Sequence, residues 1–220
     1  RVGTKEQLVV RLDREQTRDI SPGIFHDILK LVTVLLEDVK LVAISDYGKG
    51  VVTEELMATV CEICSAKKIP VFVDPKGINF SKYRGADVIK PNFVTMEAFY
   101  GREILNVEEL EKAAESIIFA TGCSSCIMTW ESNGAVLFHK NGKWIHYPCS
   151  RIWNTPYMSG AGDIFMAGLA VGVSMGLSLE TACKAATELA SADVGNAGTK
   201  TVSANDWNRL MELYDPGGRV

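Results

Sequence analysis

The sequence predicts an α/β protein with a mostly parallel sheet, helices on both faces and a short antiparallel meander. Three observations lead to this prediction. Short apolar segments alternate with longer amphipathic segments over the first 90 or so residues, which is typical of βαβ units. Asn-Gly pairs at 133–134 and 141–142 then separate short β-rich segments, as in hairpins. Two long apolar helical segments follow, which completes a three-layer α/β/α arrangement.

The composition is that of a soluble globular protein of about one domain. The chain has 220 residues, of which 47% are hydrophobic and 23% charged, and its net charge is −4. This mildly acidic balance argues against nucleic acid and anionic membranes as partners, because both are bound by basic patches. No apolar segment approaches the roughly 18 residues that span a bilayer, and the N-terminus lacks the pattern of a signal peptide. Six cysteines in a chain of this length do not suggest a disulfide framework, so we expect a cytoplasmic protein with reduced thiols.

The first half of the chain is expected to contain four strands and two helices. The expected strands are Gln7–Asp13, Leu41–Ser45, Pro70–Asp74 and Ala86–Lys90. A helix is expected over Gly23–Asp38, where apolar residues recur at helical spacing. A second helix is expected from Thr53, which can cap it, to about Lys67.

The second half is expected to continue with the meander and three helices. The expected strands are Ser125–Trp130, Ala135–His139 and Trp144–Tyr147. Apolar helices are expected over about Ala161–Met175 and Leu179–Val194. Ser203 and Asp206 can form a capping box for a last helix.

Polar side chains follow three successive predicted strands. Asp46 and Lys49 follow the first, Asp74 and Lys76 the second, and Asn92 the third. Ligands of open α/β sheets bind outside the carboxyl ends of the strands, so these residues are candidates for a binding site. The alternative is that Asp, Gly and Pro at these positions only form turns.

A glycine-rich turn opens the first of the two apolar helices. Residues 159–163 read Ser-Gly-Ala-Gly-Asp. Glycines allow a close approach of the backbone, and the free N–H groups of a first helical turn favour an anion. Asp163 within such an anion site can accept the proton of an alcohol that attacks a phosphoryl group. The alternative is that Asp163 only caps the helix.

Taken in order, these motifs resemble the ribokinase-like (PfkB) carbohydrate kinases over nearly the whole chain. Within that family they look most like the heptose 7-phosphate kinase domain of bifunctional ADP-heptose synthases. The motifs that carry the resemblance are Asp46-Tyr47-Gly48-Lys49-Gly50, Asp74-Pro75-Lys76-Gly77, Lys90-Pro91-Asn92, Gly160-Ala161-Gly162-Asp163 and Gly198-Thr199-Lys200-Thr201-Val202-Ser203.

The resemblance implies a sugar kinase that uses ATP and Mg²⁺. Asp163 would be the general base, and Gly160, Ala161 and Gly162 would supply N–H groups to the transferring phosphoryl group. Asp46 and Lys49 would lie near the acceptor. The implied nucleotide-binding residues are Asn92, Thr95, Glu97, Lys76, Ser159, Gly198 and Ser203. No direct protein ligand to the metal is implied, and Mg²⁺ would be held through Asn92 and Glu97.

The chain departs from the family pattern in three places. The family has Asn-x-x-Glu where this chain has Thr95, so that Glu97 is the nearest carboxylate, and Tyr157 stands at a family Asp. No first strand or Gly-Gly sugar-binding turn precedes Arg1. Residues 1–214 therefore look like the C-terminal two-thirds of such a kinase, and 215–220 like a linker or tail. We expect a homodimer or a missing N-terminal region to complete the domain.

A zinc site is the main competing interpretation of the cysteines. The pairs Cys61/Cys64 and Cys123/Cys126 lie far apart in the sequence, and the first lies within a predicted helix. We interpret them as small buried residues. The histidines at 26, 139 and 146 have no ligand spacing.

The sequence thus leads to one favoured function and two alternatives. The favoured function is an ATP-dependent sugar-phosphate kinase, with a heptose 7-phosphate of ADP-heptose (lipopolysaccharide precursor) synthesis as acceptor. The first alternative is a degenerate kinase domain that binds a nucleotide or a partner without catalysis, because of Thr95, Tyr157 and the absent N-terminal motifs. The second is a structural or dimerising half-domain without nucleotide affinity.

Overall fold

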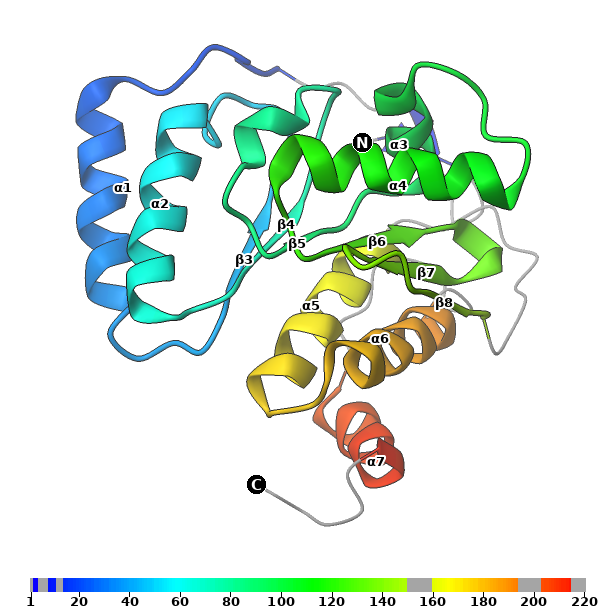
Figure 1. Ribbon diagram of the computed structural model, residues 1–220. Helices are drawn as coiled ribbons and strands as arrows, with labels where there is room; N and C mark the ends of the chain where they lie inside the picture. The colour runs from blue at the N-terminus through cyan, green and yellow to red at the C-terminus, as the bar shows by residue number, and fades with distance from the viewer. Residues whose placement is uncertain (1, 4–7, 11–13, 150–159, 194–202, 215–220) are drawn as a thin grey trace.

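A six-stranded mixed sheet forms the centre of the protein (Figure 1). The computed structural model describes residues 2–3, 8–10, 14–149, 160–193 and 203–214. The strands are β3 (Val42–Ser45), β4 (Val71–Asp74), β5 (Val88–Ile89), β6 (Ser125–Thr129), β7 (Ala135–His139) and β8 (Trp144–Tyr147). They lie side by side in chain order; β3 to β6 run parallel, and β7 and β8 are antiparallel additions. The predicted parallel sheet and meander are confirmed.

Helices cover both faces of this sheet (Figure 1). Their bounds are α1 (Pro22–Leu35), α2 (Glu54–Lys67), α3 (Phe93–Tyr100), α4 (Val107–Thr121), α5 (Ala161–Ser174), α6 (Leu179–Asp193) and α7 (Ala204–Tyr214). Two short 3₁₀ turns, η1 (Phe80–Tyr83) and η2 (Glu131–Asn133), lie in the connections. In Figure 1, α1, α2, α3 and α4 lie on one side of the strands, and α5 and α6 lie on the other.

The period of two in the central strands divides the core between the two faces. Val71 and Val73 of β4 pack with α2 and α4, whereas Phe72 between them packs with α5 and α6. Leu137 of β7 likewise faces α5 and α6, and its neighbour Val136 faces the opposite layer. A strand buried on both faces must be apolar along its whole length, which explains the short continuous apolar segments of the sequence.

Local capping sets where the site-bearing helices begin. The Thr53 hydroxyl accepts a hydrogen bond from the Leu56 amide at the start of α2, as predicted. The Asn92 side chain does the same for the Thr95 amide at the start of α3. Helix α5 begins differently, because Gly160 stands at its N-cap with φ of 102° and no side chain caps the turn. The left-handed φ explains why a glycine is needed there.

The expected strand near the N-terminus is confirmed over the residues that the structure describes. Leu8–Val10 (β2) pairs antiparallel with Val2–Gly3 (β1), in a two-stranded sheet separate from the central one. Gln7 and residues 11–13 of the expected strand lie outside the described residues. Helices α3 and α4, which the sequence analysis did not delimit, connect β5 to β6. The predicted tail 215–220 lies outside the described residues.

Four of the cysteines considered for zinc are buried in the layer of α2 and α4. Cys61, Cys64, Cys123 and Cys126 all belong to the core cluster on that face. Burial, with a smaller contribution from Cys64, raises the pKa of Cys61 to about 11, so this thiol stays protonated at neutral pH.

Within the described part of the chain, no helix is both long and apolar enough to cross a membrane.

Candidate active site

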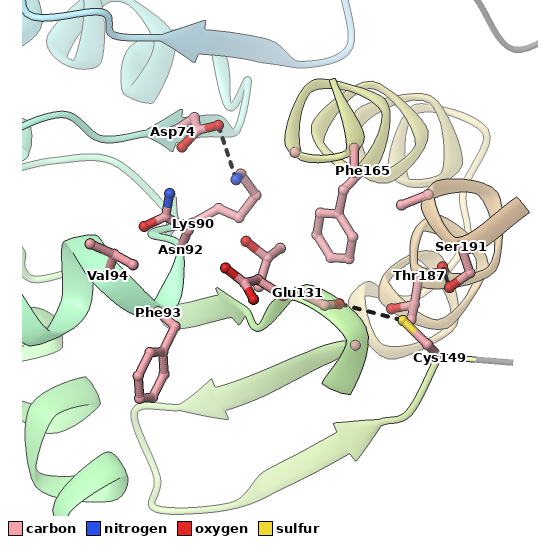
Figure 2. A pocket seen from close by; sticks show the side chains of 15 residues that line it. Asp74, Lys90, Asn92, Phe93, Val94, Glu131, Cys149, Phe165, Thr187 and Ser191 are labelled. Carbon is pink, nitrogen blue, oxygen red and sulfur yellow. Dashed lines mark hydrogen bonds and ion pairs between the residues drawn. The ribbon is translucent and has the colours of Figure 1, made fainter. Parts of the chain in front are cut away.

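Two adjoining cavities lie at the carboxyl ends of the parallel strands, beside the start of α5. Cavity A has a volume of about 290 Å³ and extends from the start of α5 to α6, and Figure 2 shows the side chains around it. Cavity B has a volume of about 230 Å³ and lies between the ends of β3 and β4 and the first turn of α5. Asp74, Asn92 and Gly162 line both cavities, so the two spaces share a wall.

Cavity B brings together most of the residues that the sequence selected. It is lined by Ser45, Asp46, Tyr47, Asp74, Pro75, Lys76, Asn92, Thr95, Gly160, Gly162 and Asp163. They come from segments up to 118 positions apart, such as Ser45 and Asp163. Because the carboxyl ends of parallel strands meet at one edge, turns distant in the sequence converge there.

The Asp46 carboxylate is held inside the protein by three donors. It accepts hydrogen bonds from the Gly48 amide (2.7 Å), the Tyr83 hydroxyl (2.7 Å) and the Lys82 ammonium (2.5 Å), and its side chain is only 2% exposed. Burial alone would raise its pKa, but these three hydrogen bonds outweigh it and hold the pKa of Asp46 below its usual value. Asp46 thus stays ionised and fixes the turn after β3.

The same network reaches the turn after β4. The Tyr83 hydroxyl accepts a hydrogen bond from the Lys76 amide at 2.9 Å while it donates to Asp46. The aliphatic part of Lys76 lies over Gly48, because a Cβ added to that glycine would meet Lys76 Cγ at 3.3 Å. The two turns that border cavity B are therefore tied together through a fully buried tyrosine.

Asp163 lies in the first turn of α5, where its carboxylate faces the turn after β3. It is exposed, and the hydroxyl of Tyr47 is 3.4 Å from its Oδ1 atom. Backbone N–H groups of this first turn have no partners within the helix, and the helix dipole adds positive potential there. A base beside an anion-binding turn is an arrangement suited to phosphoryl transfer.

An ion pair between the buried Lys90 and the partly buried Asp74 lies at the wall between the cavities. The Lys90 ammonium lies 2.9 Å from Asp74 Oδ2, and the Lys90 side chain is 2% exposed. The Lys90 nitrogen is also near Gly162, since a Cβ added there would lie 3.8 Å from it. Burial raises the pKa of Asp74; Lys90 opposes this, and nearby Asp163 adds to it. A cation is thus fixed beside the anion-binding turn.

The residues after β5 are only partly brought to the site. Asn92 lines both cavities and Thr95 lines cavity B, but Glu97 lines neither. The Glu97 carboxylate instead accepts a hydrogen bond from the Ile104 amide at 2.9 Å, in the loop after α3. Residues two positions apart in a helix project from different faces. Thr95 therefore lines cavity B, whereas the Glu97 side chain points elsewhere.

The remaining sequence candidates lie apart from the cavities or outside the described residues. Lys49 forms an ion pair with Glu15 in the segment that precedes α1. Ser203 is exposed just before α7, where its carbonyl accepts from the Trp207 amide, and it lines neither cavity. Ser159, Gly198 and Tyr157 lie outside the described residues.

Lys90, Tyr47 and Glu131 line the cavities but were given no role from the sequence. A signal for Lys90 was present, because it directly follows a buried strand just as Asp46 does. Tyr47 also follows a strand end, but an aromatic residue in a turn suggests packing as readily as a site. Nothing local marks Glu131, because its place in cavity A depends on how β6 and β7 pair.

Comparison with known proteins assigns this chain to a family. The sequence profile of pfkB family carbohydrate kinases matches residues 12–206. The bifunctional protein HldE of Trichlorobacter lovleyi is 35% identical over 205 residues, which are 92% of this chain and 41% of that protein. HldE of Geobacter sulfurreducens is 33% identical over the same shares. The chain spans about two-fifths of the length of the curated relatives it matches.

Solved structures share the fold. Phosphofructokinase-2 from Escherichia coli, crystallised with potassium, superposes with a TM-score of 0.73 at 20% identity, over 89% of this chain and 63% of that one. Arabidopsis thaliana ribokinase in complex with ribose and ATP gives a TM-score of 0.71 at 19% identity, over 89% and 60%. At these identities the likeness establishes the ribokinase-like three-layer architecture.

Proposed function

The chain belongs to the pfkB family of carbohydrate kinases, and we propose that it transfers the γ-phosphoryl group of ATP to a hydroxyl of a sugar phosphate. The observation that carries this proposal is the position of Asp163, in the first turn of α5 between the shared wall and the turn after β3. ATP would occupy cavity A, with its phosphates toward Gly162 and Lys90. The acceptor sugar would occupy cavity B.

The proposed reaction is a single displacement at the γ-phosphorus. The acceptor hydroxyl gives its proton to the Asp163 carboxylate while its oxygen forms a bond to the γ-phosphorus. The bond from that phosphorus to the β–γ bridging oxygen breaks, and ADP leaves with those electrons. The N–H groups of the 160–162 turn and the Lys90 ammonium stabilise the charge on the transferring group.

The oxygen donors of the shared wall fit a magnesium nucleotide. No cluster of three or more His, Cys, Asp or Glu side chains in the described residues is arranged to hold a metal by itself. Mg²⁺ rarely needs such a cage, because it is usually held by one or two carboxylates together with substrate phosphates and water. Asn92 and Thr95 offer amide and hydroxyl oxygens there. When bound, Mg²⁺ neutralises phosphate charge.

For the acceptor we propose a heptose 7-phosphate, used in ADP-heptose synthesis. The support is the similarity to the HldE proteins and the lysines beside cavity B. Lys76 lines this cavity, and Lys82 forms an ion pair with Asp46, which also lines it. A lysine ammonium is a compact cation that suits the phosphate of a phosphorylated sugar. Completion of the acceptor site by a further N-terminal region or a second copy stays a prediction, as does a cytoplasmic location.

The test is the effect of Asp163→Asn on sugar-dependent ADP release. The substitution keeps the size of the side chain but removes the base, so we expect turnover to fall by about 10²–10⁴-fold. Asp27→Asn on exposed α1 is a matched control and should leave turnover unchanged. Thermal unfolding of both variants should match the unaltered protein. An Asp163→Asn variant that retains most of its turnover would contradict the assignment of the base.

A degenerate kinase domain is the second candidate, and one observation favours it. The carboxylate that the family has in the Asn-x-x-Glu turn is replaced by Thr95, and Glu97 is turned toward Ile104. This alternative expects nucleotide binding without sugar-dependent ADP release. Calorimetric titration of ATP with and without Mg²⁺ separates the two, because a working kinase site should bind the nucleotide more tightly with the metal.

A further inference from the structure

Glu131 occupies an unusual backbone position at the edge of cavity A. It opens the turn between β6 and β7 with φ of +40°, in the left-handed region that glycine favours. The turn is tightly fixed, because the Trp130 amide donates to the Gly134 carbonyl at 2.7 Å. A Cβ added to Gly134 would lie 2.0 Å from the Tyr147 carbonyl. The backbone of Glu131, and so the point from which its side chain projects, is therefore fixed by a tight hairpin.

The Glu131 side chain is one of those that line cavity A. Figure 2 shows it extending from the ribbon into the cavity, toward Asn92 and Lys90. The backbone carbonyl of Glu131 accepts a hydrogen bond from the Cys149 thiol on the other side of the turn (3.6 Å). The side chain and the backbone carbonyl of Glu131 thus point in different directions.

Around cavity A, the Glu131 carboxylate has no cationic partner in the part of the chain that the structure describes. The Lys90 ammonium is already paired with Asp74 at 2.9 Å. Among the described residues, no cationic side chain forms an ion pair with Glu131. A nucleotide polyphosphate placed in this cavity would therefore meet an unpaired negative charge. Such an arrangement is favourable only when a cation lies between the carboxylate and the phosphates.

We propose that Glu131 is the carboxylate that faces the divalent cation of the bound nucleotide in this protein. The inference rests on the proposed nucleotide site. Thr95 has no carboxylate, and the Glu97 carboxylate is engaged by the Ile104 amide. Of the residues described, Glu131 is the acidic residue of cavity A that forms no ion pair with a protein cation. Carboxylate oxygen is a preferred ligand of Mg²⁺, bound directly or through water.

A ribose hydroxyl is the other group of a nucleotide that a carboxylate could bind. The two cases make opposite predictions when the metal is left out. A carboxylate that faces the cation should repel the metal-free nucleotide, whereas one that binds ribose should favour the nucleotide with or without metal. Figure 2 shows the Glu131 carboxylate directed toward Asn92 and Lys90, two residues of the proposed phosphate site, and this direction favours the cation.

The experiment is a calorimetric titration of ADP into the 220-residue chain, with Mn²⁺ and with a chelator. For Glu131→Gln we expect about tenfold weaker binding of Mn²⁺-ADP. Metal-free ADP should bind as well as before, or more tightly. Depletion of the free Mn²⁺ paramagnetic resonance signal gives a second readout that is independent of turnover. Glu62→Gln, at an exposed position of α2, removes the same charge away from the site and should change neither affinity.

Two further variants strengthen the test. Glu131→Gly suits the left-handed backbone, so it should fold at least as stably as the unaltered chain and still lose the metal-dependent affinity. Adding Thr95→Glu to Glu131→Gln places a carboxylate three residues after Asn92 and should restore part of the Mn²⁺-ADP affinity. Recovery in the double variant would support a shared role of the two positions.

The outcomes separate this proposal from the proposed function. Equal losses with and without Mn²⁺ would overturn it in favour of ribose binding. No change in either affinity would overturn it as well, and the nucleotide site would still stand. If the unaltered, folded chain binds ADP under neither condition, the proposed function fails and this inference fails with it.

Discussion

Removal of the Tyr83 hydroxyl should weaken the connection between the two turns that border cavity B. This hydroxyl donates to the Asp46 carboxylate at 2.7 Å and accepts from the Lys76 amide at 2.9 Å, inside a fully buried side chain. Tyr83→Phe deletes one oxygen and preserves the ring, which packs against Phe80 in a T-shaped contact. The hydroxyl also lies 3.2 Å from the Lys76 carbonyl oxygen, and the substitution separates all of its hydrogen bonds from the surrounding packing.

The expected cost follows from the kinds of bond that are lost. A hydrogen bond to a charged group contributes about 1.5–3 kcal/mol, and the bond from Lys76 is one between neutral groups. The phenylalanine ring recovers part of this through burial of apolar surface. We expect the free energy of unfolding to fall by about 2 kcal/mol. For a chain of this size, that corresponds to a melting temperature lower by about 4–8 °C.

Urea unfolding followed by circular dichroism measures this cost. Tyr100→Phe is the matched control, because the hydrogen bond of the Tyr100 hydroxyl within the described part of the chain is to the exposed Arg102, and its loss should leave the free energy of unfolding nearly unchanged. A double-mutant cycle with Asp46→Asn should give a coupling of about 1 kcal/mol or more. A Tyr83→Phe variant as stable as Tyr100→Phe, or additive with Asp46→Asn, would refute the proposed link between the turns.

Three other outcomes are expected from the same region. The lowered pKa of Asp46 contributes stability above about pH 4 that is lost as the pH falls through the folded pKa, so Asp46→Asn should flatten the acid limb of a stability profile. Gly50→Ala places a Cβ 1.9 Å from the Arg18 carbonyl at φ of +77°, so trypsin should cleave after Arg18 faster. Lys90→Met leaves the partly buried Asp74 without its cation and should lower the free energy of unfolding in urea, with part of the loss recovered by adding Asp74→Asn.

The parts of the fold that depend on local chemistry could be predicted from the sequence. Helix α2 begins after Thr53 as expected, because its N-cap hydrogen bond joins Thr53 to Leu56, only three positions along the chain. The meander was found from its Asn-Gly pairs, which determine hairpins locally. The gathering of Asp46, Lys76 and Asn92 at one cavity follows from a general property of parallel sheets and needed no knowledge of side-chain contacts.

The partners of individual side chains could not be predicted in this way. Asp46 was selected as an acceptor-binding residue, yet its carboxylate is held by Lys82 and Tyr83, which are 36 and 37 positions away. That pairing depends on how η1 packs against α2 and α4, and no local pattern encodes it. Glu97 shows the same difficulty at shorter range, because the shape of the loop after α3 gives its carboxylate the Ile104 amide as a partner.

The wall shared by the two cavities has a consequence for the order of events in the proposed reaction. Asp74, Asn92 and Gly162 line both spaces, so a donor in one and an acceptor in the other would be held against the same surface at the same time. Such a ternary complex needs no phosphorylated enzyme between the two substrates. Initial rates should then give intersecting double-reciprocal lines, and a γ-phosphoryl group made chiral with oxygen isotopes should be transferred with inversion of configuration.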